Sequence, residues 1–200
     1  HTGGTVDKLE SIPGFCTELE PEKFMENAKK YGICVIGQSG DFNPADKKLY
    51  ALRDVTATVK SIPLITSSIM SKKLAAGADV IVLDVKTGNG AFMKNLKDAT
   101  ELAKTLVDIG NGAGKKTYAV ISEMNEPLGY AIGNSLEVIE AIDTLKGNGP
   151  RDLYNLCIEL GSLMVAASDK NISSDQAKQI LKNTIDDGSA FRKFKEFIEA

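Results

Sequence analysis

Three hydrogen-bond donors, Arg53, Ser68 and Lys72, lie in one short region of this 200-residue chain, and two of them are cationic. Ser68 and Lys72 are four residues apart, so they share a face if the segment is helical. A pocket lined by such donors suits a planar ligand with carbonyl oxygens that gains negative charge during a reaction. Spacing alone favours a plainer interpretation, in which Arg53 pairs with Asp54 or Asp46 and Lys72 faces solvent.

Two glycine-containing loops are candidate ligand sites. Residues 1–5 read His-Thr-Gly-Gly-Thr and precede a helix that the pattern predicts over residues 6–11. Exposed N–H groups at a helix start attract anions, although an ordinary helix cap explains this loop at least as well. Residues 87–90 read Thr-Gly-Asn-Gly and follow an apolar run directly. Loops at strand ends often face a ligand, which need not be phosphate.

Apolar runs alternate with helical periodicity along much of the chain, which predicts an α/β fold. The runs typical of buried parallel strands are residues 32–37, 79–85 and 117–121. The predicted helices are residues 22–31 and 95–109, followed in a helical C-terminal portion by 134–145, 151–167, 173–185 and 190–200. Gly110 is interpreted as the stop of the second helix, and Ser173 or Ser174 as a cap. We expect a mixed, largely parallel sheet flanked by helices.

The composition argues against several classes of protein. The chain is 42% hydrophobic and 26% charged, as an ordinary globular domain is. A net charge of -3 leaves no basic surplus for a nucleic-acid groove. Cys16, Cys34 and Cys157 form neither a CxxC pair nor a zinc pattern, and no long apolar span is present. These features favour a cytoplasmic protein that binds neither nucleic acid nor membrane.

Four blocks carry a resemblance to a known family: residues 1–14, 50–73, 84–93 and 129–134. In this order and spacing they resemble the bacterial pyrimidine-nucleoside phosphorylase and thymidine phosphorylase family over essentially the whole chain. Family members are longer. The resemblance therefore implies that residues 1–200 are one partial α/β domain, without the family's N-terminal phosphate loop (Lys-His-Ser-x-Gly-Gly) and its C-terminal domain.

The resemblance implies a pyrimidine-base site in this chain. It places Arg53, Ser68 and Lys72 on the base, where donors would stabilise the anion that forms as the base leaves its sugar. Tyr50 and Phe92 are expected to line the same pocket, although plain core packing explains these two equally well.

The resemblance also implies phosphate and cation contacts. It carries one phosphate contact onto Thr5, and a potassium ion onto the carbonyl oxygens of Leu128 and Ala131 and the carboxylate of Glu140. An ordinary exposed helix position explains Glu140 equally well. No catalytic residue is expected here, because the family's histidine lies in the missing loop and His1 aligns with a different residue.

The implied reaction is phosphorolysis of uridine, thymidine or deoxyuridine. Inorganic phosphate, the co-substrate, releases free base and (deoxy)ribose 1-phosphate. The intact protein is expected to be a homodimer, and this chain alone to supply the pyrimidine-binding part with little or no turnover. Two alternatives stay open: a phosphoribosyltransferase of related fold, which needs a diphosphate-binding glycine loop and an acidic metal site, and a non-catalytic α/β binding domain.

Overall fold

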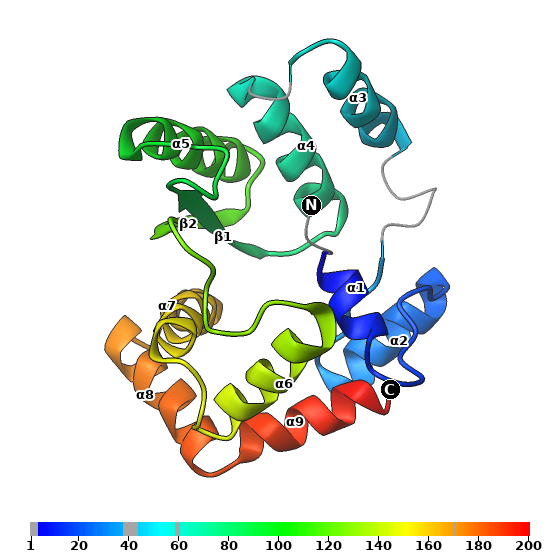
Figure 1. The fold of residues 1–200 in the computed structure, drawn as a ribbon, viewed down its shortest axis with the longest axis vertical. Coiled ribbons are helices and arrows are strands. Elements are labelled where there is room, and N and C mark those ends of the chain that lie inside the picture. The colour runs from blue at the N-terminus through cyan, green and yellow to red at the C-terminus, as the bar shows by residue number, and fades with distance from the viewer. Residues whose placement is uncertain (1–3, 38–43, 59–60, 170) are drawn as a thin grey trace. The chain divides into compact units, whose positions relative to one another are not determined.

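The computed structural model describes residues 4–37, 44–58, 61–169 and 171–200. Over these residues the chain is mostly helical with a two-stranded parallel sheet, so the expected α/β class is confirmed (Figure 1). It divides into two compact units. The first comprises residues 1–39, 128–158 and 178–200, and the second comprises 40–127 and 159–177. No helix in the described ranges is long and apolar enough to cross a membrane.

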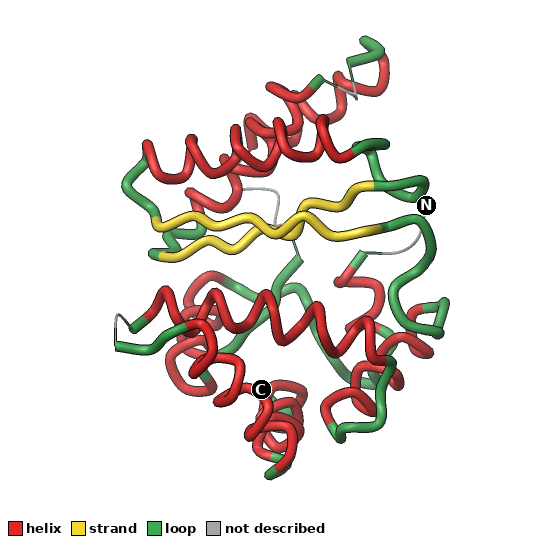
Figure 2. Tube along the Cα trace, turned by 90° about the vertical axis from the view of Figure 1, so that its left-hand side faces the viewer, coloured by secondary structure: helices red, strands yellow, loops and turns green. Residues whose placement is uncertain are grey.

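The sheet belongs to the second unit. Strands β1 (Val80–Thr87) and β2 (Lys116–Glu123) run parallel, with Val80 opposite Lys116 and Thr87 opposite Glu123 (Figure 2). Helix α5 (Leu96–Gly112) is the crossover between them, as a parallel pair requires. The strands predicted at residues 79–85 and 117–121 are therefore confirmed.

One face of the sheet forms the core of the second unit. Successive strand residues point to opposite faces, so Ile81, Leu83 and Val85 are buried together. They pack with α5 and with helix α4 (Ile62–Ala75), which contributes Ile65 and Met70. Burying a large apolar side chain contributes roughly 1.5–3 kcal/mol. This cluster therefore fixes α4 against the sheet.

Two helix starts match the sequence signals. The Asn95 side chain accepts the N–H of Asp98 at 2.9 Å and begins α5. Ser173 precedes α8 (Ser174–Asp186), where its Oγ accepts the N–H of Gln176 at 3.3 Å and its own N–H donates to Gln176 Oε1 at 2.8 Å. This reciprocal pair is a capping box, which identifies Ser173 as the cap.

Gly110 does not end its helix, so that interpretation is wrong. Helix α5 continues to Gly112, and Gly110 is buried within it. A Cβ atom at position 110 would lie 2.0 Å from Thr117 Oγ1. The glycine is therefore needed for the close approach of α5 to β2.

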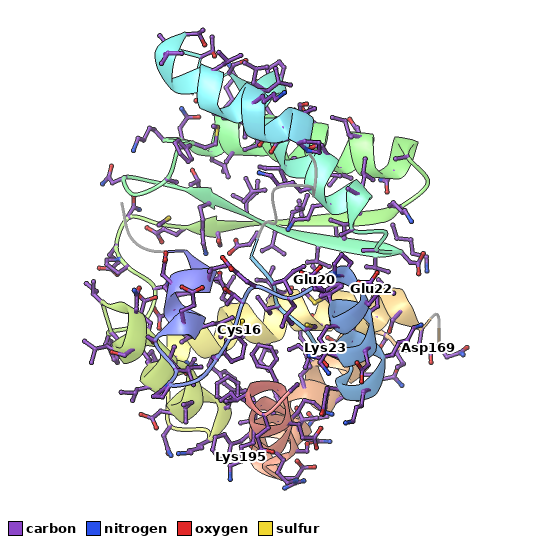
Figure 3. All side chains as sticks on the ribbon, turned by 90° about the vertical axis from the view of Figure 1, so that its right-hand side faces the viewer. Cys16, Glu20, Glu22, Lys23, Asp169 and Lys195 are labelled. Atoms are coloured by element: carbon purple, nitrogen blue, oxygen red, sulfur yellow. The ribbon has the colours of Figure 1, made fainter. Side chains whose placement is uncertain are left out.

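The first unit is helical. It contains α1 (Thr5–Glu10), α2 (Pro21–Tyr31), α6 (Asn134–Leu145) and α9 (Ser189–Ile198), while α7 (Arg151–Ser168) and α8 contribute to both units. The predicted helices are confirmed at these places. Figure 3 shows Glu20 and Glu22 at the start of α2, where acidic side chains complement the helix dipole. Phe197 of α9 is buried, and its ring centroid lies 5.2 Å from that of Phe15.

Residues 32–37 form no strand, so this prediction is wrong. Gly32 adopts a left-handed conformation and caps α2. The residues that follow, 33–37, have no regular secondary structure, and the N–H of Gly37 donates to the carbonyl of Thr17 at 2.9 Å. A strand needs a ladder of bonds with a neighbour. The apolar composition of this segment indicates a strand, but composition alone supplies no neighbouring strand to pair with.

Candidate functional site

Helix α4 carries two of the three predicted base ligands. It begins after Ser61, with Pro63 in its first turn, where a missing N–H costs nothing. Ser68 is 7% exposed, and Lys72 follows one turn later on the same face. The Lys72 Nζ lies 3.5 Å from Ser68 Oγ. The expected pairing of a hydroxyl and an ammonium on one helix face is present.

Asp46 supplies a counter-charge that the sequence analysis did not assign to Lys72. It lies in the first turn of helix α3 (Pro44–Val55), and its Oδ2 is 2.9 Å from Lys72 Nζ. The Asp46 side chain is 7% exposed and that of Lys72 is 34% exposed. Lys72 is therefore paired with a residue of another helix, contrary to the interpretation that left it in solvent. Helices α3 and α4 are neighbours (Figure 1).

The side chains of Tyr50 and Arg53 lie outside the described part of the structure, so their place in a base pocket stays a prediction. The α3 backbone is described. Positions 50 and 53 follow Asp46 by four and seven residues, which places the three positions on one side of the helix. Of these positions, that of Asp46 is turned toward α4, because its carboxylate contacts Lys72.

The loop after β1 is closed by its own hydrogen bonds. The N–H groups of residues 88, 89 and 90 donate to Met93 O at 3.0 Å, Asn125 Oδ1 at 3.0 Å and Met124 O at 2.7 Å. A Cβ at position 90 would lie 2.9 Å from Met124 O, so glycine is needed there. The loop therefore ties together the carboxyl ends of the two strands and does not present these donors to an anion.

Phe92 extends from this loop. Its side chain is 66% exposed, so plain core packing does not explain it. An exposed aromatic ring beside a strand end is available to a ligand, and its role in base binding stays a prediction.

A polar cluster that the sequence analysis missed lies on the sheet face away from the core. Lys86 Nζ is 2.7 Å from Asp84 Oδ2 and 2.9 Å from Ser122 Oγ, and Ser122 Oγ donates to Asp84. Strand periodicity puts Asp84 and Lys86 on one face, and Lys86 is opposite Ser122 in the register. Ser122 joins this cluster only because β1 pairs with β2, so no local motif could predict it.

Thr5 is exposed in the first turn of α1. The preceding N–H, that of Gly4, donates to Asp7 Oδ2 at 2.6 Å. A carboxylate of the helix itself therefore already occupies part of the position that a phosphate would take. His1 lies outside the described ranges.

The loop of residues 128–133 is held by two carboxylates. Glu140 Oε1 accepts the N–H groups of Tyr130 at 2.9 Å and Ala131 at 3.0 Å, and Asp152 Oδ2 accepts that of Gly129 at 2.9 Å. Gly129 has φ +72°, and a Cβ there would lie 2.2 Å from Glu140 Oε2. Glu140 is therefore no ordinary exposed helix residue, because it organises the loop backbone.

Hydrogen bonds keep two carboxyl groups of the first unit ionised. The N–H groups of Gly129 and Leu153 lower the pKa of Asp152. The hydrogen bond from Lys8, together with the N–H of Gly133, lowers the pKa of Glu137. The Lys8–Glu137 pair joins α1 to α6.

The predicted cation ligands all belong to this loop and its anchor. The backbone oxygens of Leu128 and Ala131 and the free edge of the Glu140 carboxylate are hard oxygen donors, the kind that such a cation prefers. Among the described residues no three His, Cys, Asp or Glu side chains are grouped to hold a metal ion. A cation here would depend on backbone carbonyls, and the residues present fit that chemistry.

Known proteins resemble this chain over its full length. A pyrimidine-nucleoside phosphorylase of Geobacillus stearothermophilus is 64% identical over 200 residues. The proteins of the same name from Staphylococcus haemolyticus and Bacillus subtilis are each 61% identical over 199 residues. All of this chain is covered in each comparison, but only 46% of each relative, so the chain spans about half the length of these relatives. The resemblance expected from the four blocks is confirmed.

The family assignment rests on a longer match than any motif provides. The model of the glycosyl transferase family, a/b domain, matches residues 1–191. That match includes both strands, the α3–α4 pair and the loop held by Glu140. The chain therefore belongs to the glycosyl transferase family and represents its a/b domain.

Proposed function

We propose that the intact protein catalyses the reversible phosphorolysis of pyrimidine nucleosides, and that this chain supplies the pyrimidine-binding part. The observation that carries the proposal is the 64% identity, over all 200 residues, to a protein named pyrimidine-nucleoside phosphorylase. The Ser68–Lys72 pair on α4 supports it, because it provides donors of the kind that a departing pyrimidine requires. Uridine, thymidine and deoxyuridine are the proposed substrates.

In the proposed reaction an oxygen of inorganic phosphate forms a bond to the anomeric carbon of the sugar. The bond from that carbon to the ring nitrogen of the base breaks, and its electron pair leaves with the base. Arg53 and Lys72 then face a negative charge spread over the ring and its carbonyl oxygens. Hydrogen bonds to charged groups are worth roughly 1.5–3 kcal/mol each, or about ten- to a hundredfold in rate.

The remaining parts of the proposal follow the family resemblance. Thr5 contacts the phosphate, and the histidine that serves the reaction lies in a segment that these 200 residues do not contain. A potassium ion is held by Leu128, Ala131 and Glu140. The site is completed by other parts of the intact protein, which we propose to be a homodimer. We also propose a reducing, cytoplasmic compartment, because Cys16 and Cys34 are free thiols.

The test is a phosphorolysis assay on the longest polypeptide that the gene encodes. Ultraviolet absorbance would follow the release of base from thymidine and from uridine, with and without inorganic phosphate. Phosphate-dependent cleavage of both nucleosides supports the proposal. A folded protein that cleaves neither would refute it.

Neighbouring lysines on α4 provide a matched control. Lys72→Met should lower kcat/KM for the nucleoside by about ten- to a hundredfold, because it removes an ammonium from the base. Lys73→Met removes the same charge one residue away, at an exposed position, and should have little effect. Equal losses in the two variants would contradict the assignment of Lys72 to the base.

A further inference from the structure

We propose that Asp46 is a positioning residue, which holds the Lys72 ammonium where it meets the carbonyl oxygen of a pyrimidine. This inference rests on the proposed function. Asp46 would not touch the base itself. It acts through Lys72 and sets the direction of that side chain.

The geometry of the ion pair supports this role. Asp46 Oδ2 lies 2.9 Å from Lys72 Nζ, and Ser68 Oγ lies 3.5 Å from the same nitrogen. The carboxylate approaches from α3 and the hydroxyl from α4, so the ammonium is held from two elements. Asp46 and Ser68 are both buried, whereas the Lys72 side chain is 34% exposed. The two anchors are therefore fixed, and the cation that they hold remains accessible.

A lysine needs such anchoring more than an arginine does. Its ammonium is a point charge on a flexible four-carbon stem, without the planar fork that orients a guanidinium. A misplacement by about 1 Å at a reacting centre can cost a hundredfold in rate. The partner that reduces this freedom lies 26 residues upstream of Lys72.

The burial of Asp46 also favours the pair. A carboxylate that is nearly enclosed loses its hydration and must be matched by a cation or by donors. Most ion pairs at protein surfaces contribute little, and the Lys115–Asp79 pair of the same unit is of that kind, with a distance of 3.8 Å and a fully exposed Asp79 side chain. The Asp46–Lys72 pair differs from it in both distance and burial.

The test is a double-mutant cycle on the full-length protein, with phosphorolysis as the readout. Asp46→Asn keeps the shape and removes the charge, and we expect kcat/KM for the nucleoside to fall about tenfold while KM for phosphate stays unchanged. In a Lys72→Met background the same substitution should have no further effect, because Asp46 acts through Lys72. Asp46→Glu should recover part of the loss, and Asp79→Asn is the control without effect.

The possible outcomes distinguish failure of the proposed function from failure of the role proposed for Asp46. An inactive wild-type protein defeats the proposed function, and this inference with it. If the wild type is active but the losses in kcat/KM caused by Asp46→Asn and Lys72→Met multiply in the double variant, Asp46 only supports the fold. That result would overturn this inference alone. If Asp46→Asn does not fold, the same cycle is run with Asp46→Glu, and multiplication of its effect with Lys72→Met overturns the inference equally.

Discussion

Lys72 and Glu140 are both charged residues that the sequence predicts as ligands, but the regions around them hold these charges in different ways. Lys72 is paired with Asp46, which belongs to another helix and is far away in the sequence. Glu140 accepts the N–H groups of Tyr130 and Ala131, which lie ten and nine residues upstream in the adjacent loop. The first arrangement depends on tertiary packing, and the second on a local loop.

The two arrangements suit different roles, ligand binding for Lys72 and support of a loop for Glu140. The Lys72 ammonium has three donors and a partly exposed position, so it can meet a ligand while its partner holds it. One oxygen of Glu140 already serves two backbone donors, so its first role is to shape the loop. Substitutions in the α3–α4 pair should therefore change base recognition, whereas substitutions around residues 128–133 should first change stability.

The largest effect is expected from Arg53→Ala. If Arg53 faces the base, the loss of its fork should lower kcat/KM for the nucleoside by about ten- to a hundredfold, with an unchanged thermal unfolding midpoint. Arg192→Ala, at an exposed arginine of α9, is the control. An Arg53→Ala enzyme as active as the control would remove Arg53 from the site and contradict the assignment of base recognition to the α3–α4 pair.

Gly129→Ala should destabilise the first unit. A left-handed backbone costs an alanine about 1–2 kcal/mol, and the new Cβ would in addition lie 2.2 Å from Glu140 Oε2. Gly14→Ala isolates the backbone cost, because Gly14 has φ +83° and no neighbour within 4 Å. Chemical denaturation should therefore give a larger loss in unfolding free energy for Gly129→Ala. Equal losses would mean that Glu140 moves aside freely and does not hold the loop.

Ser68→Ala should have a smaller effect on catalysis. The Ser68 hydroxyl is a neutral donor to the base and its contact with Lys72 is long at 3.5 Å, so a loss of about 0.5–1.5 kcal/mol, or about two- to tenfold in kcat/KM, is the expected limit. Ser67→Ala, at the exposed neighbouring position, should leave the rate unchanged. A loss for Ser68→Ala as large as that for Lys72→Met would contradict this ranking of the neutral donor below the charged one.

The smallest effect concerns acid stability. The folded state holds the pKa of Asp152 below its ordinary value of 3.8, so Asp152 stabilises the fold above that pH and loses its contribution as the pH falls through the lowered value. Asp152→Ala should therefore be slightly less stable than wild type at neutral pH, with a difference that disappears in acid. Thermal unfolding at several pH values would measure it. A constant difference at all pH values would contradict the charge argument.

Much of the fold follows from local signals. Helix α6 has the predicted bounds, Asn95 and Ser173 cap their helices, and the two Val- and Ile-rich runs form the sheet. The failures arose where a local signal has two meanings. Residues 32–37 have the apolar composition of a strand but pair with no neighbouring strand. Gly110, predicted to end its helix, instead allows α5 to approach β2 closely.

Sequence spacing predicted the contact between Ser68 and Lys72 but not the contacts of site residues with other elements. Four-residue spacing correctly placed Ser68 and Lys72 together, because helix geometry alone determines that contact. The partnership of Asp46 with Lys72 depends on how α3 packs against α4, and Asp152 reaches Gly129 from another helix. No sequence spacing encodes such contacts between elements. The spacing of positions 46, 50 and 53 along α3 is the sequence signal that could have identified Asp46 as a further residue of the candidate site.

The most direct test of the account is the affinity of the full-length protein for free uracil and thymine, measured by calorimetry for wild type, Lys72→Met and Glu140→Gln. We predict that Lys72→Met weakens base binding by about tenfold or more, and that Glu140→Gln leaves it within about twofold. That result would assign base recognition to the α3–α4 pair. Weakening by Glu140→Gln as large as that by Lys72→Met, or no weakening by Lys72→Met, would contradict it.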